Sequence, residues 1–175
     1  MNTLKKLTIV LAAMAVLTVA LGTPSVQAAT FQLPAGTEVK VKFNSDLKIS
    51  SGELAVGTPL AVTLAEPIKI GDRLLVAAGA AGKAVVAEVK KAGKPGKPGM
   101  IKVDFLELGT RGGFKTPDGS ALKLAGSAVG KGKSKKLLAY CTIVGIFLIN
   151  GGQGELDPNQ TYTATIAETV VLASE

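Results

Sequence analysis

The chain has 175 residues, a length that favours one domain with at most a small appendage. Hydrophobic residues make up 47% of it, which excludes a disordered chain, and the formal net charge is +7. The sequence has no histidine and one cysteine, which excludes Ser-His-Asp triads, Cys-His dyads, imidazole metal sites and intrachain disulfides.

Residues 1–28 have the features of a secretory signal peptide. Lys5 and Lys6 precede an uncharged apolar run of 15 residues, Leu7 to Leu21, which is shorter than the roughly 20 residues that span a bilayer. Small residues around Ala28 predict cleavage after it. An uncleaved membrane anchor is the alternative, and it also takes the rest of the chain out of the cytoplasm. We therefore expect a periplasmic or otherwise exported protein.

Residues 29–175 are predicted to form a single β domain. Val39, Val41 and Phe43 alternate with lysines, which is the two-residue period of a half-buried strand. Similar segments follow at 58–65, 73–77, 83–90, 101–105, 120–125 and 161–172, with Gly- and Pro-containing turns between them. No window has the period of a long amphipathic helix. We therefore predict an all-β fold, a small antiparallel β-barrel or sandwich.

Two segments interrupt the alternation. Residues 90–99, KKAGKPGKPG, predict an exposed loop without ladder hydrogen bonds, which we expect to tolerate replacement. Residues 130–152 form an insert that is first basic and then apolar. Its apolar run, Leu137–Ile149, is too short at 13 residues to cross a bilayer as a helix. Its β-branched residues favour a buried strand, and a hairpin that dips into a membrane is the alternative.

No group of residues predicts catalysis. Asp104 and Glu107 are an odd number of positions apart, so a regular strand would send their side chains to opposite faces. Cys141 lies inside the apolar run, where a thiol is usually a small buried hydrophobe. Three further aspartates occur in predicted turns without the spacing of a calcium loop: Asp72, Asp118 and Asp157. We therefore expect no metal and no cofactor.

The lysines of the two interrupting segments are the candidate binding residues. Together they could make a cationic rim for anionic lipid, lipopolysaccharide or an acidic polymer. The alternative is that they serve solubility and protect strand edges from pairing with other chains. These lysines are Lys90, Lys91, Lys94, Lys97, Lys131, Lys133, Lys135 and Lys136.

Four stretches are similar to a common bacterial exported β domain. They read LPAGTEVKVKF, AVGTPLAVTLAEPIKIGDRLLVAAGAAGKAVV, MIKVDFLEL and TPDGSALKLAG. Their order resembles the C-terminal β-barrel of TrbI-like scaffold proteins of type IV secretion systems, over roughly residues 33–126 and more faintly 150–172. The resemblance implies a barrel-like fold. That family's long helical insert corresponds at most to the apolar run here, and its Pro-rich arm is missing, so the resemblance by itself does not imply a pore or secretion role.

These observations favour a non-enzymatic, exported cell-envelope protein that serves as a structural or interaction module. The alternative is a peripheral membrane or secretion-complex component that contacts the membrane through Leu137–Ile149 and the preceding lysines. An enzymatic barrel is least favoured, because no acid–base pair is visible. Expected partners are other envelope proteins or anionic envelope polymer or lipid. Nucleic acid is not expected, because the chain is exported.

Overall fold

The computed structural model describes residues 29–44, 48–134 and 150–174. These residues form β-strands and no helix, so the predicted all-β class is confirmed. The strands are β1 (Thr30–Leu33), β2 (Glu38–Phe43), β3 (Ile49–Ser50), β4 (Pro59–Leu64), β5 (Ile68–Ile70), β6 (Arg73–Val76), β7 (Ala81–Lys90), β8 (Met100–Leu108), β9 (Phe114–Lys115), β10 (Leu122–Ala125), β11 (Ser127–Lys131), β12 (Glu155–Leu156), β13 (Tyr162–Ile166) and β14 (Val170–Ser174).

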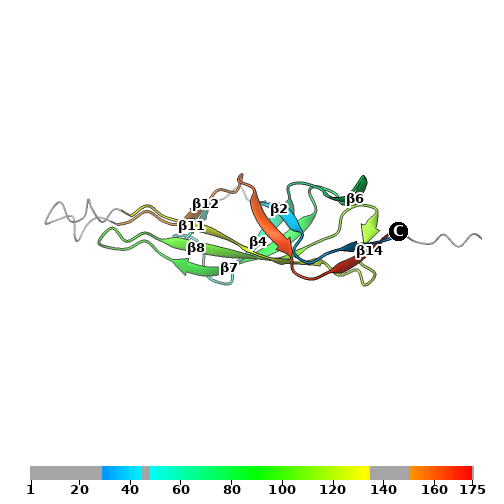
Figure 1. The fold of residues 1–175 in the computed structure, drawn as a ribbon. Helices are drawn as coiled ribbons and strands as arrows, with labels where there is room; N and C mark the ends of the chain where they lie inside the picture. The colour runs from blue at the N-terminus through cyan, green and yellow to red at the C-terminus, as the bar shows by residue number, and fades with distance from the viewer. Residues whose placement is uncertain (1–28, 45–47, 135–149, 175) are drawn as a thin grey trace, which may run out of the picture.

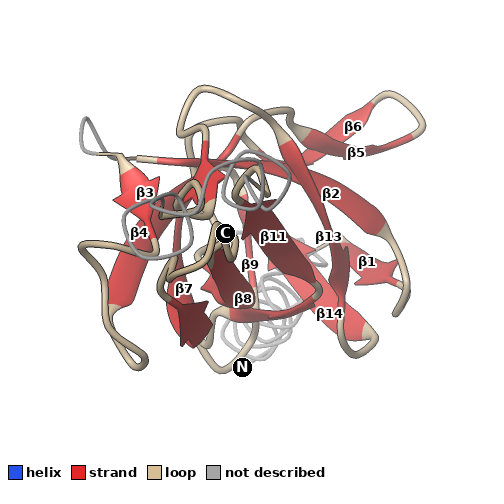
Figure 2. Cartoon of the chain, turned by 90° about the vertical axis from the view of Figure 1, so that its left-hand side faces the viewer, coloured by secondary structure: helices blue, strands red, loops and turns tan. Residues whose placement is uncertain are grey.

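Within the described residues, six antiparallel strands close into a barrel. Their order is β10-β13-β2-β4-β7-β8, and β10 closes the ring because it pairs with β13 at its end and with β8 at its start. Seen along the long axis, the strands surround a common centre (Figure 2). Of the two architectures that the sequence predicts, the structure is therefore the small barrel.

The alternating residues fill the barrel interior. Val39, Val41 and Phe43 of β2 are buried, whereas the lysines between them are half-buried or exposed. The Phe43 ring centroid lies 6.0 Å from that of Phe105 on β8 and 5.2 Å from that of Tyr162 on β13. Burying each such apolar side chain stabilises a fold by about 1.5–3 kcal/mol, so the alternation determines which face of every strand turns inward.

The prediction of one strand over 161–172 is wrong. The chain bends at Ala167 and Glu168, so that β13 belongs to the barrel and β14 belongs to a separate sheet in the order β1-β14-β9. The bend is held by hydrogen bonds from Ala167 N to Lys123 O (2.9 Å) and from Ala35 N to Thr169 Oγ1 (3.1 Å). These partners are distant in sequence, and no Gly or Pro marks the bend. Alternation alone therefore could not reveal it.

The molecule is elongated, and the barrel is only part of its length (Figure 1). The β1-β14-β9 sheet and the β5–β6 hairpin lie at one end, where the rings of Phe31 and Phe114 meet edge to face with centroids 5.3 Å apart. At the other end, β7 and β8 continue beyond the barrel, and β8 also pairs with β11. We call this second end, with β3, β12 and residues 91–99, 132–134 and 150–154, the distal end.

Glycines allow the backbones of the distal end to touch. A methyl group added at Gly154 would lie 2.5 Å from Gly130 O and 2.6 Å from Met100 Cα, closer than real Cβ atoms approach other atoms. The same close approach to backbone atoms occurs at Gly99, Gly130, Gly132 and Gly151, and we call these five residues the glycine seam. Because the opposing atoms belong to the main chain, a side-chain movement cannot relieve such a contact.

We expect Gly130→Ala to lower the free energy of unfolding by about 2–3 kcal/mol, the usual cost of overpacking a fitted site. An added Cβ there would lie 2.6 Å from the Glu155 carbonyl carbon. Gly93→Ala is the matched control at the same end, because its added methyl meets no atom within 4 Å. Guanidinium denaturation of both variants measures the difference. Equal stability of the two would contradict a close-packed seam.

Candidate functional site

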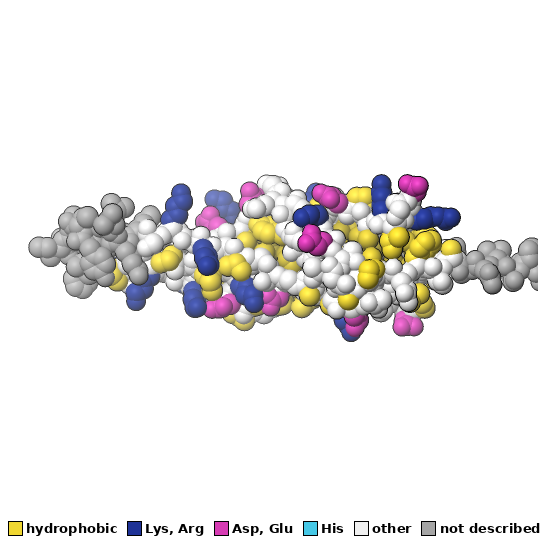
Figure 3. All heavy atoms as spheres, in the orientation of Figure 1, with side chains coloured by type: hydrophobic (Ala, Val, Ile, Leu, Met, Phe, Trp, Pro, Cys, Tyr) yellow, Lys and Arg dark blue, Asp and Glu magenta, His cyan; other side chains and the backbone are white. Residues whose placement is uncertain are grey.

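The distal end brings the two predicted lysine segments together. Gly132 N donates to Gly99 O (2.9 Å), and Gly151 N donates to Gly93 O (3.3 Å). Gly99 N donates in turn to Gly152 O (2.8 Å), so residues 93–99 are bonded to both ends of the 130–152 insert. Figure 3 shows basic side chains around this end of the molecule, on the left.

The predicted site lysines that the structure describes are all exposed. Lys135 and Lys136 lie outside the described residues, as does the apolar run Leu137–Ile149 with Cys141. The exposed lysines of the predicted set are Lys90, Lys91, Lys94, Lys97, Lys131 and Lys133. The structure therefore gathers, at one end of an elongated molecule, lysines that are up to 43 positions apart in the sequence.

The expectation that residues 90–99 lack ladder hydrogen bonds is wrong. Gly93 and Lys97 exchange two backbone hydrogen bonds, of 3.0 and 2.8 Å, and form a β-bridge. Gly96 and Gly99 are buried, although the four lysines of the segment are exposed. Proline removes only its own donor, so the other residues of the loop remain able to pair. The reason for expecting this loop to tolerate replacement therefore does not hold.

A buried polar network joins three segments beneath the lysines. The Ser51 side chain is fully buried, and its hydroxyl donates to Gln153 Oε1 (2.9 Å) and accepts from Gly154 N (2.9 Å). Gln153 Oε1 also accepts from Ala92 N (3.0 Å). No buried side-chain polar atom of the described residues lacks a partner. This network fixes residues 51, 92 and 153 relative to one another, and with them the loop that carries the lysines.

Ion pairs neutralise some of the lysines near the distal end and leave others unpaired. Lys90 Nζ lies 2.8 Å from Glu88 Oε1, and Lys102 Nζ lies 3.5 Å from Asp104 Oδ1. The hydrogen bond from Lys90 and its charge, with a smaller contribution from Lys102, hold the pKa of Glu88 below its usual value. Among the described residues, five of the site lysines make no ion pair: Lys91, Lys94, Lys97, Lys131 and Lys133.

The prediction that Asp104 and Glu107 face opposite sides is wrong. The register of β7 against β8 shifts between Lys83 and Ala84, so that Leu106 is an extra residue in β8. This bulge turns Glu107 to the outer face, where its carboxylate lies 2.6 Å from Lys83 Nζ. Asp104 is also only half-buried, and it pairs with Lys102. Each carboxylate is thus held by its own lysine, which is not the arrangement of a pair that shares a substrate.

The three turn aspartates lie in local turns. Asp157 accepts from Asn159 N (2.9 Å), the turn bond that a short carboxylate makes with its own backbone. Asp72 and Asp118 both lie in turns, as the sequence predicts. In residues 29–44, 48–134 and 150–174, no three His, Cys, Asp or Glu side chains are placed to hold a metal ion.

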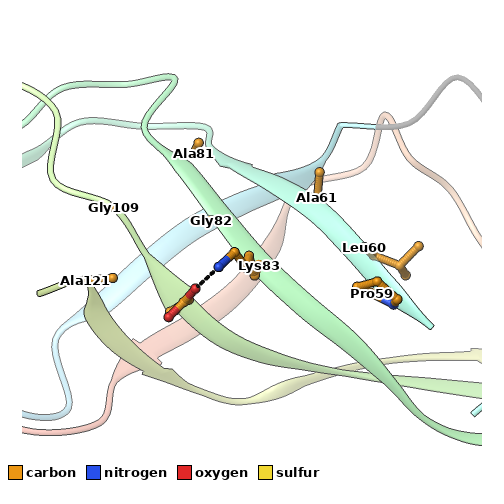
Figure 4. Close-up of a pocket in the computed structure, with 9 residues that line it drawn as sticks. Pro59, Leu60, Ala61, Ala81, Gly82, Lys83, Gly109 and Ala121 are labelled. Carbon is orange, nitrogen blue, oxygen red and sulfur yellow. Dashed lines mark ion pairs between the residues drawn. The ribbon is translucent and has the colours of Figure 1, made fainter. Parts of the chain in front are cut away.

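A shallow apolar hollow of about 520 Å³ lies on the outside of the barrel, over β4 and β7 (Figure 4). Small side chains at Ala61, Ala81 and Ala121 leave it open, and Gly82 lies there because β8 approaches it closely. Its charged lining residues are Lys83 and Glu107, which pair with each other, and the hydrogen bond to Glu107 raises the pKa of Lys83. The hollow offers space to an apolar group but no unpaired reactive side chain.

Sequence reasoning missed the residues that position the lysines. Ser51 and Gln153 are a serine and a glutamine next to glycines, a pattern that equally fits an exposed turn. The burial of Ser51 depends on a partner 102 positions away. The density of glycines in residues 126–154 was the available signal, because close backbone contact requires residues without a Cβ.

Comparison with family models, with curated proteins and with solved structures finds no match to this chain. The resemblance to the TrbI-like barrel therefore stays a resemblance of turns and alternation. The part of the chain that the structure describes contains no helix long and apolar enough to cross a membrane.

We expect Ser51→Ala and Gln153→Ala each to lower the free energy of unfolding by about 1–3 kcal/mol, because each leaves buried polar groups without a partner. The double variant should cost less than the sum of the two, since both changes remove the same hydrogen bond. Ser127→Ala, at an exposed position of β11, is the control. Additive costs in a denaturation cycle would show that the two side chains act separately.

Proposed function

We propose that this chain is a non-enzymatic, exported cell-envelope protein, an interaction module whose distal end contacts anionic envelope polymer or lipid. The observation that carries the proposal is the bonding of residues 93–99 to both ends of the 130–152 insert, which concentrates exposed lysines at one end. A cluster of like charges on a fixed backbone attracts a partner of opposite charge, and the attraction weakens with salt.

Cleavage at the predicted point is compatible with the hydrogen bonds of the residue that follows it. Ala29 N donates to Ser174 Oγ (3.0 Å), and Ser174 N donates to Ala29 O (3.0 Å). Ala29, which directly follows the predicted cleavage point, is thus held by the last described strand, so cleavage after Ala28 would keep both of these hydrogen bonds. Removing residues 1–28 would also remove Lys5 and Lys6, leaving 18 basic against 13 acidic residues, a net charge of +5.

A second candidate function is membrane contact through Leu137–Ile149. It is supported by the hydrogen bond from Gly152 N to Lys133 O (2.9 Å), because residues on both sides of this run then meet at the distal end, beside the lysines. An apolar segment that follows four lysines is suited to an anionic bilayer surface, where each lysine contributes about 1 kcal/mol.

The export proposal predicts cleavage after Ala28 and a salt-dependent association with the envelope. When the full chain is produced in a bacterium with a periplasm, we expect the periplasmic fraction to contain it after a high-salt wash. The intact mass of the recovered protein should lack residues 1–28. A mass that retains them, or recovery from the cytoplasm, would contradict the proposal, and a need for detergent would favour the second candidate.

Ile146→Asp separates a core strand from a membrane segment. We expect it to unfold the domain, because burying an unpaired carboxylate costs several kcal/mol of the roughly 5–15 kcal/mol that stabilise a domain. Ile70→Asp, at a position 37% exposed in β5, is the control and should stay folded. Circular dichroism and sedimentation with anionic liposomes measure both variants. A folded Ile146→Asp protein that has lost liposome sedimentation would favour membrane contact.

A further inference from the structure

The strands β7, β8 and β11 place two lysines in one row across the distal ribbon. Met100 of β8 pairs with Lys90 of β7 on one side and with Lys131 of β11 on the other. Side chains of directly paired residues project from the same face of a sheet. Neighbouring strands are about 4.8 Å apart, so the backbones of Lys90 and Lys131 are roughly 10 Å apart, with the half-buried Met100 between them.

Lys133 extends this row along the chain. It follows Lys131 by two residues, and the hydrogen bond from Gly132 N to Gly99 O continues the pairing between them. Two residues of extended chain span about 7 Å. We call Lys90, Lys131 and Lys133 the ribbon lysines. Their backbone spacings of roughly 7 and 10 Å are set by ladder hydrogen bonds, so little ordering of the main chain is needed when a ligand binds.

The charge of this surface is positive toward its far end. One row nearer the barrel, Lys102 is flanked by Glu88 and Val129, and Lys102 also pairs with Asp104, so that row offers little net charge. Lys131 and Lys133 make no ion pair among the described residues. The pair between Lys90 and Glu88 is exposed, with side chains 67% and 43% accessible, and an exposed pair is weak enough for another anion to displace the carboxylate.

We propose that the ribbon lysines bind a linear polymer with repeated anionic groups, such as phosphates, laid across the distal ribbon. This proposal rests on the proposed function and names the ligand class and the lysines that select it. Neighbouring strands are rotated by roughly 20–25°, so lysines on different strands do not lie in one plane. A flexible polymer can follow such a twisted row, whereas a flat bilayer meets only part of it.

The tip lysines, Lys91, Lys94 and Lys97, provide a charge-matched comparison. The chain reverses between Gly93 and Lys97, so Lys94 and Lys97 lie around a turn, and Lys91 follows the last paired residue of β7. None of the three belongs to the cross-strand row. All three are exposed, and none makes an ion pair among the described residues. A variant with these three changed to glutamine has the same net charge as one with the three ribbon lysines changed, so the two differ only in where the charge is lost.

The experiment measures binding of the purified full chain to long-chain inorganic polyphosphate at several salt concentrations. For K90Q/K131Q/K133Q we expect affinity to fall about 100-fold, from roughly a fivefold contribution per lysine. The slope of log K against log salt should become shallower by about 2. For K91Q/K94Q/K97Q we expect a change below about threefold, because these lysines lie outside the cross-strand row that the polymer follows. Circular dichroism melts confirm that both variants fold.

Different failures separate this inference from the proposed function. Equal losses in the two variants, or a larger loss in the tip variant, would overturn the ribbon site while leaving an anion-binding distal end. Binding of the wild-type protein to phosphatidylglycerol vesicles but not to polyphosphate would overturn the choice of a polymer. If the wild-type protein binds neither ligand, the proposed function itself fails.

Discussion

The contact between main chains at the glycine seam is the constraint on which the distal end depends. Where Gly154 lies against Gly130 and Met100, no Cβ fits between the two backbones. Side chains therefore cannot fill this region as they fill the barrel. Its cohesion comes from backbone hydrogen bonds and from the Ser51–Gln153 network, which are directional and require their partners in fixed positions. A hydrophobic contact would accept more than one arrangement, whereas this one holds the lysine-bearing segments in a single register.

The barrel and the distal end thus depend on different proportions of apolar burial and main-chain contact. In the barrel, alternating apolar residues such as Val39, Val41 and Phe43 contribute buried area, and many similar sequences would serve. At the distal end, the glycine seam and the Ser51–Gln153 network add main-chain and polar contacts to the buried Ile49 and Leu156 of the small β3–β12 sheet. A long strand such as β7 links the two regions, because its first half closes the barrel and its second half carries Lys90. The barrel therefore anchors a surface whose order depends largely on main-chain contacts.

This division explains how much of the protein could be predicted from its sequence. The alternation in β2, β4 and β8 is a local property, so it predicted these strands and the all-β class. The extra residue Leu106 and the bend after Ile166 depend on hydrogen bonds to distant strands, and no local signal marks either. The lysines of the candidate site were visible as two clusters. That these clusters meet at one end could not be predicted. The meeting depends on backbone hydrogen bonds such as that between Gly99 and Gly132, which form only in the folded chain.

A charged surface differs in its selectivity according to how firmly its charges are held. Lysines on a mobile loop attract any polyanion, since the side chains rearrange to suit each one and the loop loses entropy on binding. Here Lys131 continues a ladder with Met100, and the loop opposite is tied by Gln153 to Ala92, so the backbone of the lysines is ordered before any partner arrives. Ordering of this kind favours partners whose charges recur at a matching distance. In the proposed function, the glycine seam, which has no charge, is therefore the element that would let a cationic end discriminate between polyanions.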